Sequence, residues 1–207
     1  SHVAVSFEVP ESTCQFTAMG TLKLLEILRD CEPSPRFLHT GSSEIFGMPT
    51  NAPQNEQTPL RPVTPYGVAK AFATDMVRVY RDSFGLFACN AICFNHESPR
   101  RGESFVTRKI TRSAARIKLG LDRKLSMGSV DAQRDWGYAP DFVEAFWRIL
   151  QLDQPLDWCF PRGSCIASAT GSMSPSNTSG SIGNSMSNLI PDFYARQIRK
   201  LWSATQA

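Results

Sequence analysis

The sequence predicts an α/β protein built around a partial parallel sheet with helices packed on it. Apolar residues recur at helical spacing over residues 12–30 and 66–84, and short apolar runs at 36–40 and 86–94 suit buried strands. The order helix, strand, helix, strand, with segments of these lengths, is typical of a parallel sheet whose faces are covered by helices.

The helix expected over residues 12–30 ends before Pro33, which cannot continue it. The helix expected from Tyr66 to Phe84 is followed by Gly85, the residue type that most often ends a helix. Two further amphipathic helices are expected at residues 104–119 and 140–150. The apolar faces of the two long helices are expected to be formed by Leu22, Leu25, Ile27 and Leu28 in the first and by Val68, Phe72, Met76, Val79 and Tyr80 in the second.

Composition excludes several classes of function. The chain has 207 residues, of which 42% are hydrophobic and 20% charged, as in water-soluble globular proteins. A formal charge of +3 without a basic stripe argues against nucleic-acid binding, and no apolar stretch is long enough to cross a membrane. The six cysteines form no CxxC pair, so we expect free thiols, no metal site and a cytoplasmic location.

Tyr66 and Lys70 lie four residues apart, which places the phenol and the ammonium on one face of the expected helix. The cation favours the phenolate form and makes Tyr66 usable as an acid and base near neutral pH. The same spacing is common on ordinary helix surfaces, so this pair alone leaves a purely structural interpretation open.

A second polar segment, from Thr40 to Gly47, directly follows the first expected strand. Ligands of open α/β sheets bind beyond the carboxyl ends of the strands. The Ser42 hydroxyl and the Glu44 carboxylate could both face a substrate there. The alternative is a turn in which a side chain caps a short helix.

A third segment, from Asn95 to Gly102, follows the second expected strand and contains polar and cationic groups. These groups suit a phosphate-bearing ligand, and the alternative is a solvated loop. Each of the three segments follows a strand or opens the helix that crosses back from one. We therefore expect them to converge on one crevice of the sheet.

These segments resemble the GDP-mannose 4,6-dehydratase family of extended short-chain dehydrogenases/reductases. The resemblance extends from Ser1 to about Asp157, and its most specific strings are NHESPRRG at residues 95–102 and FVTRKI at residues 105–110. The Tyr66–Lys70 pair is shared by the whole superfamily. The family implies a Rossmann-like parallel sheet with helices, followed by the start of a small substrate-binding domain.

The resemblance implies a hydro-lyase that uses NADP and converts GDP-D-mannose to GDP-4-dehydro-6-deoxy-D-mannose. In that reaction a hydride passes from C4 of the hexose to NADP while Tyr66 accepts the O4 proton and Ser42 hydrogen-bonds O4. The 4-keto group acidifies the C5 hydrogen, so a plain carboxylate, Glu44, can remove it as water is lost across C5 and C6. The hydride then returns to C6, and Lys70 also holds the nicotinamide ribose.

The resemblance also implies the binding residues and the partners. Homo-oligomers and a place in nucleotide-sugar metabolism, such as GDP-fucose biosynthesis, are expected from the family. The cations Lys109 and Arg134 suit the diphosphate of GDP-mannose. Cofactor contacts are expected at Ser1, Tyr66, Lys70, His96 and Arg101, and sugar-nucleotide contacts at Ser43, Asn95, Val106, Lys109 and Arg134.

We divide the chain into residues 1–100, the C-terminal half of an NADP-binding domain, residues 101–157, a sugar-nucleotide-binding part, and residues 158–207, an aberrant tail. The family's glycine-rich phosphate loop is expected upstream of Ser1. Residues 163–187 are dominated by Ser, Gly, Asn, Thr and Met, which predicts disorder. A shifted reading frame over residues 161–184 and again over residues 189–206 can give strings like the family's C-terminal domain. Our hypothesis is a frameshifted segment, and the alternative is a genuine Ser/Gly-rich tail.

Two other functions remain open from the sequence. Another nucleotide-sugar epimerase or dehydratase would share the fold and the Tyr66–Lys70 pair, although a simple 4-epimerase does not need the Glu44 carboxylate. A non-catalytic remnant of the family would keep the fold without turnover.

Overall fold

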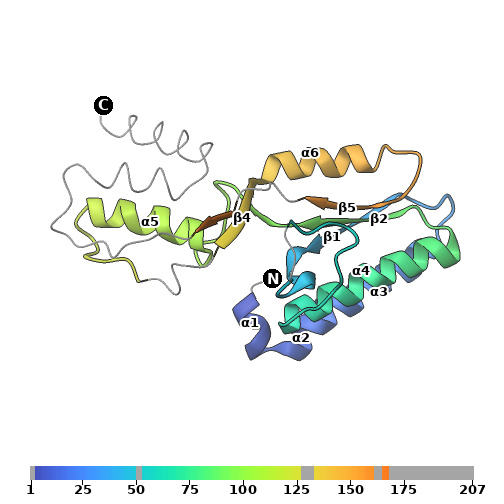
Figure 1. Cartoon of the computed structure of the whole chain (residues 1–207), viewed down its shortest axis with the longest axis horizontal. Helices are drawn as coiled ribbons and strands as arrows, with labels where there is room; N and C mark the ends of the chain where they lie inside the picture. The colour runs from blue at the N-terminus through green and yellow to red at the C-terminus, as the bar shows by residue number, and fades with distance from the viewer. Residues whose placement is uncertain (1–2, 50–52, 127–132, 161–164, 168–207) are drawn as a thin grey trace. The chain divides into compact units, whose positions relative to one another are not determined.

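The computed structural model describes residues 3–49, 53–126, 133–160 and 165–167, so most of the tail from residue 158 onward lies outside the described residues. The chain divides into unit 1, formed by residues 1–94 and 141–163, and unit 2, formed by residues 95–140 and 164–207. The predicted functional division at residues 100 and 157 stays a prediction. The elements, most of which are labelled in Figure 1, are α1 (Val3–Glu8), α2 (Pro10–Cys14), η1 (Gln15–Met19), α3 (Gly20–Arg29), β1 (Phe37–Ser42), η2 (Ser43–Phe46), α4 (Pro65–Phe84), β2 (Ala88–Cys93), β3 (Asn95–Glu97), α5 (Val106–Lys118), β4 (Gln133–Tyr138), α6 (Ala139–Ile149), β5 (Asp157–Phe160) and β6 (Cys165–Ala167).

Unit 1 contains the predicted parallel sheet, with the strand order β1-β2-β5 and every pairing parallel. The strands predicted at 36–40 and 86–94 are β1 and β2. Helices α3 and α4 lie on one side of this sheet and α6 on the other, as Figure 1 shows. All six residues of β2 are buried, as expected for a central strand covered on both faces.

The helix predicted over residues 12–30 is a continuous helical stretch of α2, η1 and α3, in which η1 is a π-helical turn. Its predicted apolar face is partly wrong. Leu25 is fully buried and Leu22 and Leu28 pack beside it, whereas Ile27 is 61% exposed. Ile27 follows Leu25 by two residues and therefore lies about 200° around the helix from it.

Helix α4 begins and ends as its sequence predicts. The Thr64 hydroxyl accepts a hydrogen bond from the Gly67 amide at 2.9 Å, and Pro65 occupies the first turn. Gly85 ends the helix in the left-handed conformation, with φ of 68°. These local signals fix the position of the helix along the chain.

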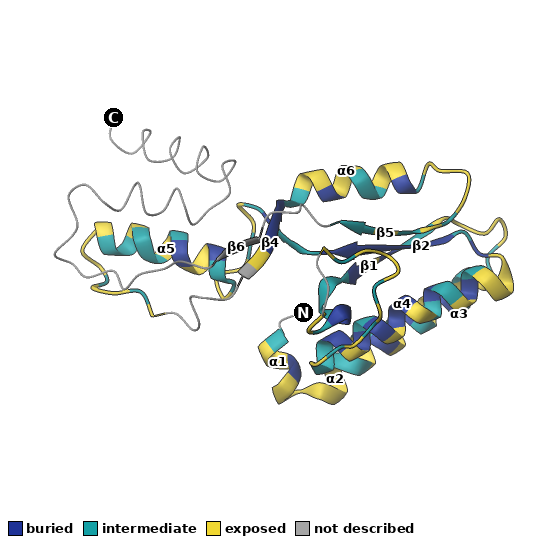
Figure 2. Cartoon of the chain, viewed as in Figure 1, coloured by how far each residue is buried: buried dark blue, intermediate teal, exposed yellow. Residues whose placement is uncertain are grey.

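The predicted apolar face of α4 is only partly the buried one. Met76 packs partly buried against the core and Tyr80 is buried, but Val68, Phe72 and Val79 are 51%, 38% and 46% exposed. Small residues make much of the face toward the sheet, because a short side chain lets a helix lie close to a strand. Figure 2 shows buried and exposed residues alternating along α4. The buried set is Gly67, Ala69, Ala71, Ala73, Thr74, Val77 and Tyr80.

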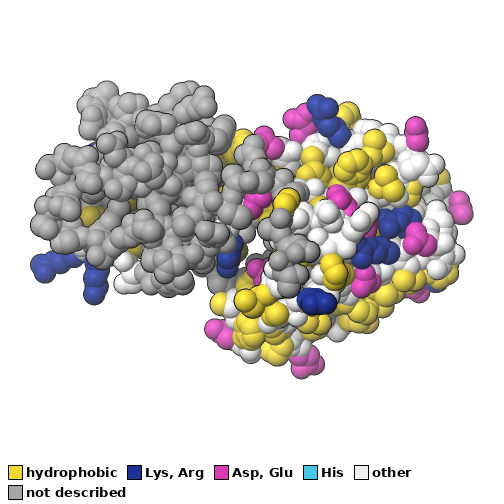
Figure 3. All heavy atoms as spheres, viewed as in Figure 1, with side chains coloured by type: hydrophobic (Ala, Val, Ile, Leu, Met, Phe, Trp, Pro, Cys, Tyr) yellow, Lys and Arg dark blue, Asp and Glu magenta, His cyan; other side chains and the backbone are white. Residues whose placement is uncertain are grey.

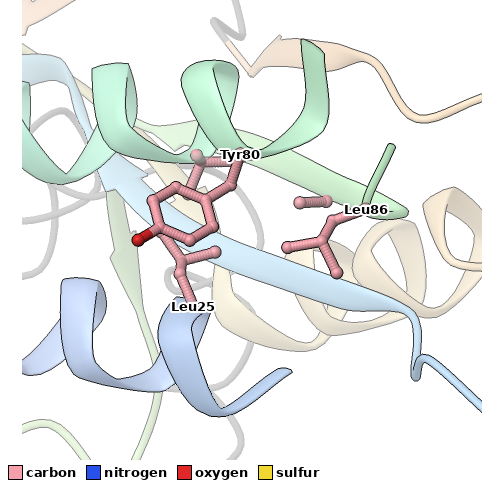
Figure 4. Close-up of a cluster of buried hydrophobic side chains, with 5 residues drawn as sticks. Leu25, Tyr80 and Leu86 are labelled. Carbon is pink, nitrogen blue, oxygen red and sulfur yellow. The ribbon is translucent and has the colours of Figure 1, made fainter. Parts of the chain in front are cut away.

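A hydrophobic cluster joins α3 and α4 to the segment that leads into β2. Leu25 and Tyr80 face each other across the two helices, and Leu86 lies beside them, as Figure 4 shows. Val77 and Ala88 complete the buried set. A second cluster on the opposite face of the sheet packs Phe142 of α6 on Ala91, Cys93 and their neighbours.

Between these apolar layers, one polar row crosses the sheet. His39, Asn90 and Asp157 are paired in register on β1, β2 and β5. The Asp157 carboxylate accepts hydrogen bonds from Arg78 Nε at 2.6 Å, Arg81 Nη1 at 2.8 Å and Asn90 Nδ2 at 2.9 Å. This cluster ties α4 to β2 and β5.

Unit 2 is built on a small mixed sheet of order β3-β4-β6. Strand β3 pairs parallel with β4, and β4 pairs antiparallel with β6. Helix α5 lies within the span predicted at 104–119 and buries Thr107 and Ile110. Among the described helices of the chain, none is long and apolar enough to cross a membrane.

Candidate active site

The short 3₁₀ helix η2 directly follows β1, and two of the predicted catalytic groups lie where these two elements meet. Ser42 ends β1 and caps η2, because its Oγ accepts a hydrogen bond from the Glu44 amide at 3.3 Å. Ile45 and Phe46 are buried against Ala71 of α4, which anchors η2. The predicted capped turn is therefore present. The same turn leaves Ser42, Ser43 and Glu44 half-buried.

Gly67 brings the start of α4 against η2. A Cβ added at Gly67 would lie 2.7 Å from the Glu44 carbonyl oxygen and 3.1 Å from the Thr64 Oγ1. No side chain fits that space, so glycine allows the backbone of α4 to touch the backbone of η2. Tyr66 precedes this contact directly, and its helix turn therefore lies next to Glu44.

Lys70 reaches back to the same end of β1. Its Nζ donates a hydrogen bond to the Thr40 carbonyl oxygen at 2.6 Å. Burial lowers the pKa of Lys70, and the nearby Cys93 thiol acts in the opposite direction. Cys93 pairs with Ser42 across the sheet, and burial raises the pKa of its thiol to about 12. It is therefore a neutral packing group and no nucleophile.

The structure thus brings the elements that bear Ser42, Glu44, Tyr66 and Lys70 together at the carboxyl end of β1. Within the described residues, no hydrogen bond or ion pair occupies the Tyr66 phenol or the Glu44 carboxylate. A hydroxyl, a carboxylate, a phenol and an ammonium at one strand end can together hold and deprotonate a polyhydroxylated ligand.

His39 lies on β1 itself, before Thr40 and Ser42, and was not singled out from the sequence. It is 5% exposed, and its Nε2 has no partner within the described residues. Burial and, to a smaller extent, the Lys70 cation lower the pKa of His39 to about 3, against the opposing effect of Asp157. His39 is therefore neutral at physiological pH, which leaves Lys70 without a second cation beside it.

In unit 2 the predicted ligand-binding residues Asn95 and His96 lie half-buried on β3, where they pair with Trp136 and Gly137 of β4. Arg101 follows in the next loop. Its guanidinium lies 3.7 Å from the centre of the Phe105 ring. Stacking of this kind fixes the plane of an arginine side chain.

Glu97 is a buried acid in the same segment that sequence reasoning did not assign. It is 2% exposed, accepts a hydrogen bond from the Thr107 hydroxyl at 2.5 Å and faces the Arg101 Nε at 3.1 Å. Burial raises the pKa of Glu97, and the Thr107 hydrogen bond and the Arg101 cation oppose that rise. The spacing of four residues between Glu97 and Arg101 was the only signal in the sequence.

The remaining predicted residues fall in three places. Val106 opens α5 and is half-buried, and Lys109 lies exposed one turn later. Arg134 is exposed on β4 of the same unit. Ser1 lies outside the described residues. Nowhere among the residues that the structure describes do three or more His, Cys, Asp or Glu side chains gather as a metal site would require.

Comparison with known proteins shows what the chain is similar to. A family model described as GDP-mannose 4,6 dehydratase matches residues 1–171. The GDP-mannose 4,6-dehydratase of Vibrio cholerae is 53% identical over 165 residues, which are 79% of this chain and 44% of that protein. GDP-mannose 4,6 dehydratase 2 of Arabidopsis thaliana is 52% identical over 162 residues, which are 76% of this chain and 43% of that protein. The chain spans less than half the length of these relatives.

Solved structures agree on the fold. RMD from Pseudomonas aeruginosa, complexed with NADPH, matches with a TM-score of 0.75 at 27% identity over 81% of this chain and 59% of that one. DesIV, a dTDP-glucose 4,6-dehydratase from Streptomyces venezuelae with NAD and TYD bound, matches with a TM-score of 0.72 at 21% identity over 81% and 51%. The second likeness concerns the fold alone. The predicted Rossmann-like α/β fold is confirmed.

Proposed function

The chain belongs to the GDP-mannose 4,6-dehydratase family, and from that premise we propose that it contains the catalytic residues of an NADP-dependent GDP-mannose 4,6-dehydratase. The proposed reaction converts GDP-D-mannose to GDP-4-dehydro-6-deoxy-D-mannose with loss of one water, which makes the protein a hydro-lyase. One observation supports this most directly. Ser42, Glu44 and the helix turn of Tyr66 and Lys70 meet at the carboxyl end of β1.

The residues present fit a nicotinamide dinucleotide. Lys70 uses one ammonium N–H on the Thr40 carbonyl and retains two more for ribose hydroxyls. Ser1, Tyr66, His96 and Arg101 complete the proposed cofactor contacts, and Arg101 offers a guanidinium that suits a phosphate. The cofactor, when bound, supplies reversible hydride transfer.

Tyr66 and Ser42 act at C4 of the hexose. Tyr66 accepts the O4 proton as the C4 hydrogen leaves as hydride, so that C4 becomes a ketone. Ser42 donates a hydrogen bond to O4 and holds it toward Tyr66. Lys70 stabilises the negative charge on the phenolate through space.

Glu44 acts as the base for the loss of water. Once C4 is a ketone, the C5 hydrogen is acidic enough for a carboxylate to remove it. The electron pair of the C5–H bond forms the C5–C6 double bond, and the C6 hydroxyl takes the proton from Glu44 and leaves as water. Hydride returned to C6 and a proton returned to C5 complete the product. A simple 4-epimerase would have no use for Glu44, which favours dehydration as the reaction.

Unit 2 supplies the proposed contacts to the nucleotide part of the substrate. Asn95, Val106, Lys109 and Arg134 all belong to this unit, and Ser43 of η2 is the remaining proposed contact. Lys109 is exposed on α5 and can pair with a diphosphate. The preference for a guanine nucleotide is part of this proposal.

We also propose that the intact protein forms a homo-oligomer. Large apolar side chains are exposed on the N-terminal helical segment from α1 to α3, where Phe7, Phe16 and Leu24 are 61%, 81% and 51% exposed. Figure 3 shows apolar side chains gathered on the surface near α1 and α2. Exposed apolar patches often mark association surfaces. Light scattering of the purified chain at several concentrations tests this part of the proposal.

A substrate trial tests the function. The purified chain is incubated with NADP⁺ and GDP-mannose, and separately with UDP-glucose and dTDP-glucose, and products are identified by mass spectrometry. Loss of one water from GDP-mannose alone is the expected result. Turnover of only another sugar nucleotide would reassign the chain to a different dehydratase. A chain that neither binds nor converts any of them, with binding followed by calorimetry, would be a non-catalytic member of the family.

A further inference from the structure

A buried carboxylate joins three parts of unit 2. Glu97 ends β3 and is 2% exposed, and its register partner on β4 is Tyr138. Its carboxylate accepts a hydrogen bond from the Thr107 hydroxyl at 2.5 Å and faces the Arg101 Nε at 3.1 Å. One side chain therefore connects the strand, the loop after it and the first turn of α5.

The connection between strand and helix does not require a charge. A neutral amide at position 97 could accept the same hydrogen bond from Thr107, and burial raises the pKa of the Glu97 carboxyl, so burial of the ionised form is unfavourable. The ionised form of Glu97 is stabilised only where the carboxylate meets a cation. Within unit 2 that cation is Arg101, the group in ion-pair contact with the carboxylate.

Arg101 is held on two sides. Its Nε is buried and lies 3.1 Å from the Glu97 carboxylate in an ion pair without hydrogen-bond geometry. The flat side of its guanidinium lies 3.7 Å from the centre of the Phe105 ring. A guanidinium has five N–H donors, and the two Nη atoms form an edge that fits two oxygens of a phosphate. Among the described residues, no other side chain pairs with Arg101, so this edge is available for a ligand.

We propose that Glu97 is a positioning residue for anion binding. Its carboxylate fixes Arg101 through Nε and turns the Nη edge outward, toward a phosphate of the dinucleotide cofactor. This inference rests on the proposed function, because it takes the NADP contact of Arg101 as its starting point. It adds a residue that makes no ligand contact and acts only through Arg101.

The test measures NADPH affinity by fluorescence for the full chain and four variants. Glu97→Gln keeps an acceptor for Thr107 and removes the charge that holds Arg101. Arg101→Gln removes the phosphate contact, and the double variant tests whether the two act as one. Glu103→Gln is the matched control, because it removes a carboxylate from the same segment that pairs instead with Arg112 at 2.6 Å.

We expect Glu97→Gln and Arg101→Gln each to weaken NADPH binding about tenfold, and the double variant to bind no more weakly than either. Glu103→Gln should bind as the wild type does. If Arg101→Gln weakens binding and Glu97→Gln does not, the positioning role is overturned while the cofactor role of Arg101 stands. Full additivity of the two losses would also overturn it, because independent effects indicate a merely structural role for Glu97.

A ligand-free measurement separates this inference from the proposed function. The Arg101 Nε proton, observed by NMR, should exchange slowly with water in the wild type and at least tenfold faster in Glu97→Gln. A wild-type chain that binds no NADPH would remove the cofactor assignment, and the proton exchange would then decide the Glu97–Arg101 contact by itself. Equal exchange in both proteins would overturn that contact.

Discussion

In unit 1 the residues proposed for chemistry lie on β1, η2 and α4, and each of these elements buries one side in a hydrophobic cluster. In unit 2 the residues proposed for ligand binding lie largely on the three-residue strand β3, in the loop after it and on α5. All three hydrophobic clusters of the described residues belong to unit 1. The geometry of unit 1 therefore depends on shape and packing, and that of the β3 segment depends on charge.

The buried cluster around Asp157 is the exception within unit 1. Burial alone would raise the pKa of Asp157, but hydrogen bonds from Arg81, Arg78 and Asn90 bring it below its ordinary value. Charge thus contributes to unit 1 where α4 meets β5. Arg78 and Arg81 lie on α4 beyond the first turn, which is the turn that contacts η2. Substitutions can separate the effect of shape from the effect of charge in each region.

The largest expected effect is that of Glu44→Gln on turnover. The amide cannot remove the C5 proton, so we expect kcat to fall by about a thousandfold. Because Ile45 and Phe46 anchor η2, the melting temperature should not change. The control is Glu11→Gln on exposed α2. The measurement is kcat from steady-state kinetics. A Glu44→Gln variant that keeps more than a tenth of wild-type kcat would show that Glu44 is not the base.

Asp157→Asn should be the most destabilising change. It removes the buried counter-charge of the Arg78 and Arg81 guanidinium groups and leaves them only the exposed carboxylates of Asp75 and Asp82. We expect a loss of about 3 kcal/mol in the free energy of unfolding. The matched control is Asp75→Asn, which pairs with the same Arg78 at 2.9 Å but has a side chain 59% exposed. That control should cost less than about 0.5 kcal/mol. Equal losses in urea titrations of the two would contradict the distinction.

Gly67→Ala tests shape at the active site. The added methyl group would lie 2.7 Å from the Glu44 carbonyl oxygen, so the start of α4 must move away from η2. We expect kcat/KM to fall about a hundredfold. Gly85→Ala is the control, because φ there is 68° but nothing lies within 4 Å of the new atom. It should cost about 1 kcal/mol of stability and leave turnover intact.

His39→Gln should make the free energy of unfolding depend less steeply on pH below about pH 6.5. The folded pKa of His39 is about 3 against an ordinary 6.5, so below that ordinary value the unfolded chain binds a proton that the folded chain does not. Wild-type stability is therefore fully present above about pH 6.5 and falls by up to about 1.4 kcal/mol per pH unit as pH drops toward the folded value. Urea unfolding between about pH 7 and about pH 5 measures the slopes. Parallel slopes in both proteins would exclude His39 as the cause.

Arg112→Gln should have the smallest effect. Arg112 pairs with Glu103 at 2.6 Å, but the two side chains are 50% and 58% exposed. Exposed pairs of this kind contribute about 0.5 kcal/mol or less. A larger loss of thermal stability would mean that charge in unit 2 acts broadly and not mainly through buried Glu97.

Local signals in the sequence were enough to predict the elements of unit 1. Thr64 and Gly85 mark the ends of α4, and the apolar runs mark β1 and β2. The buried face of α4 was partly missed because apolar spacing gives weight to large residues such as Phe72. The helix buries Ala69 and Ala73 instead, because close approach to the sheet requires small side chains.

The candidate site was predictable to the extent that it follows the strand ends. Ser42 is the last residue of β1 and Glu44 follows in η2, and Lys70 reaches the same place from α4. The contacts of Asp157 were not predictable, because Arg81 lies 76 residues away and the pairing depends on strand register. Glu97 was missed for a related reason, since its hydrogen bond to Thr107 exists only once α5 folds back on β3.

The polar row of His39, Asn90 and Asp157 has a consequence for how the sheet assembles. A shift of any strand by one residue would turn its polar side chain toward the phenylalanines of α6. Such a mispaired chain would bury an imidazole, an amide or a carboxylate in hydrocarbon, with no arginine within reach. Slipped pairings should therefore be short-lived during folding, and the strand ends that hold Ser42 and Cys93 should come into line only in the native arrangement.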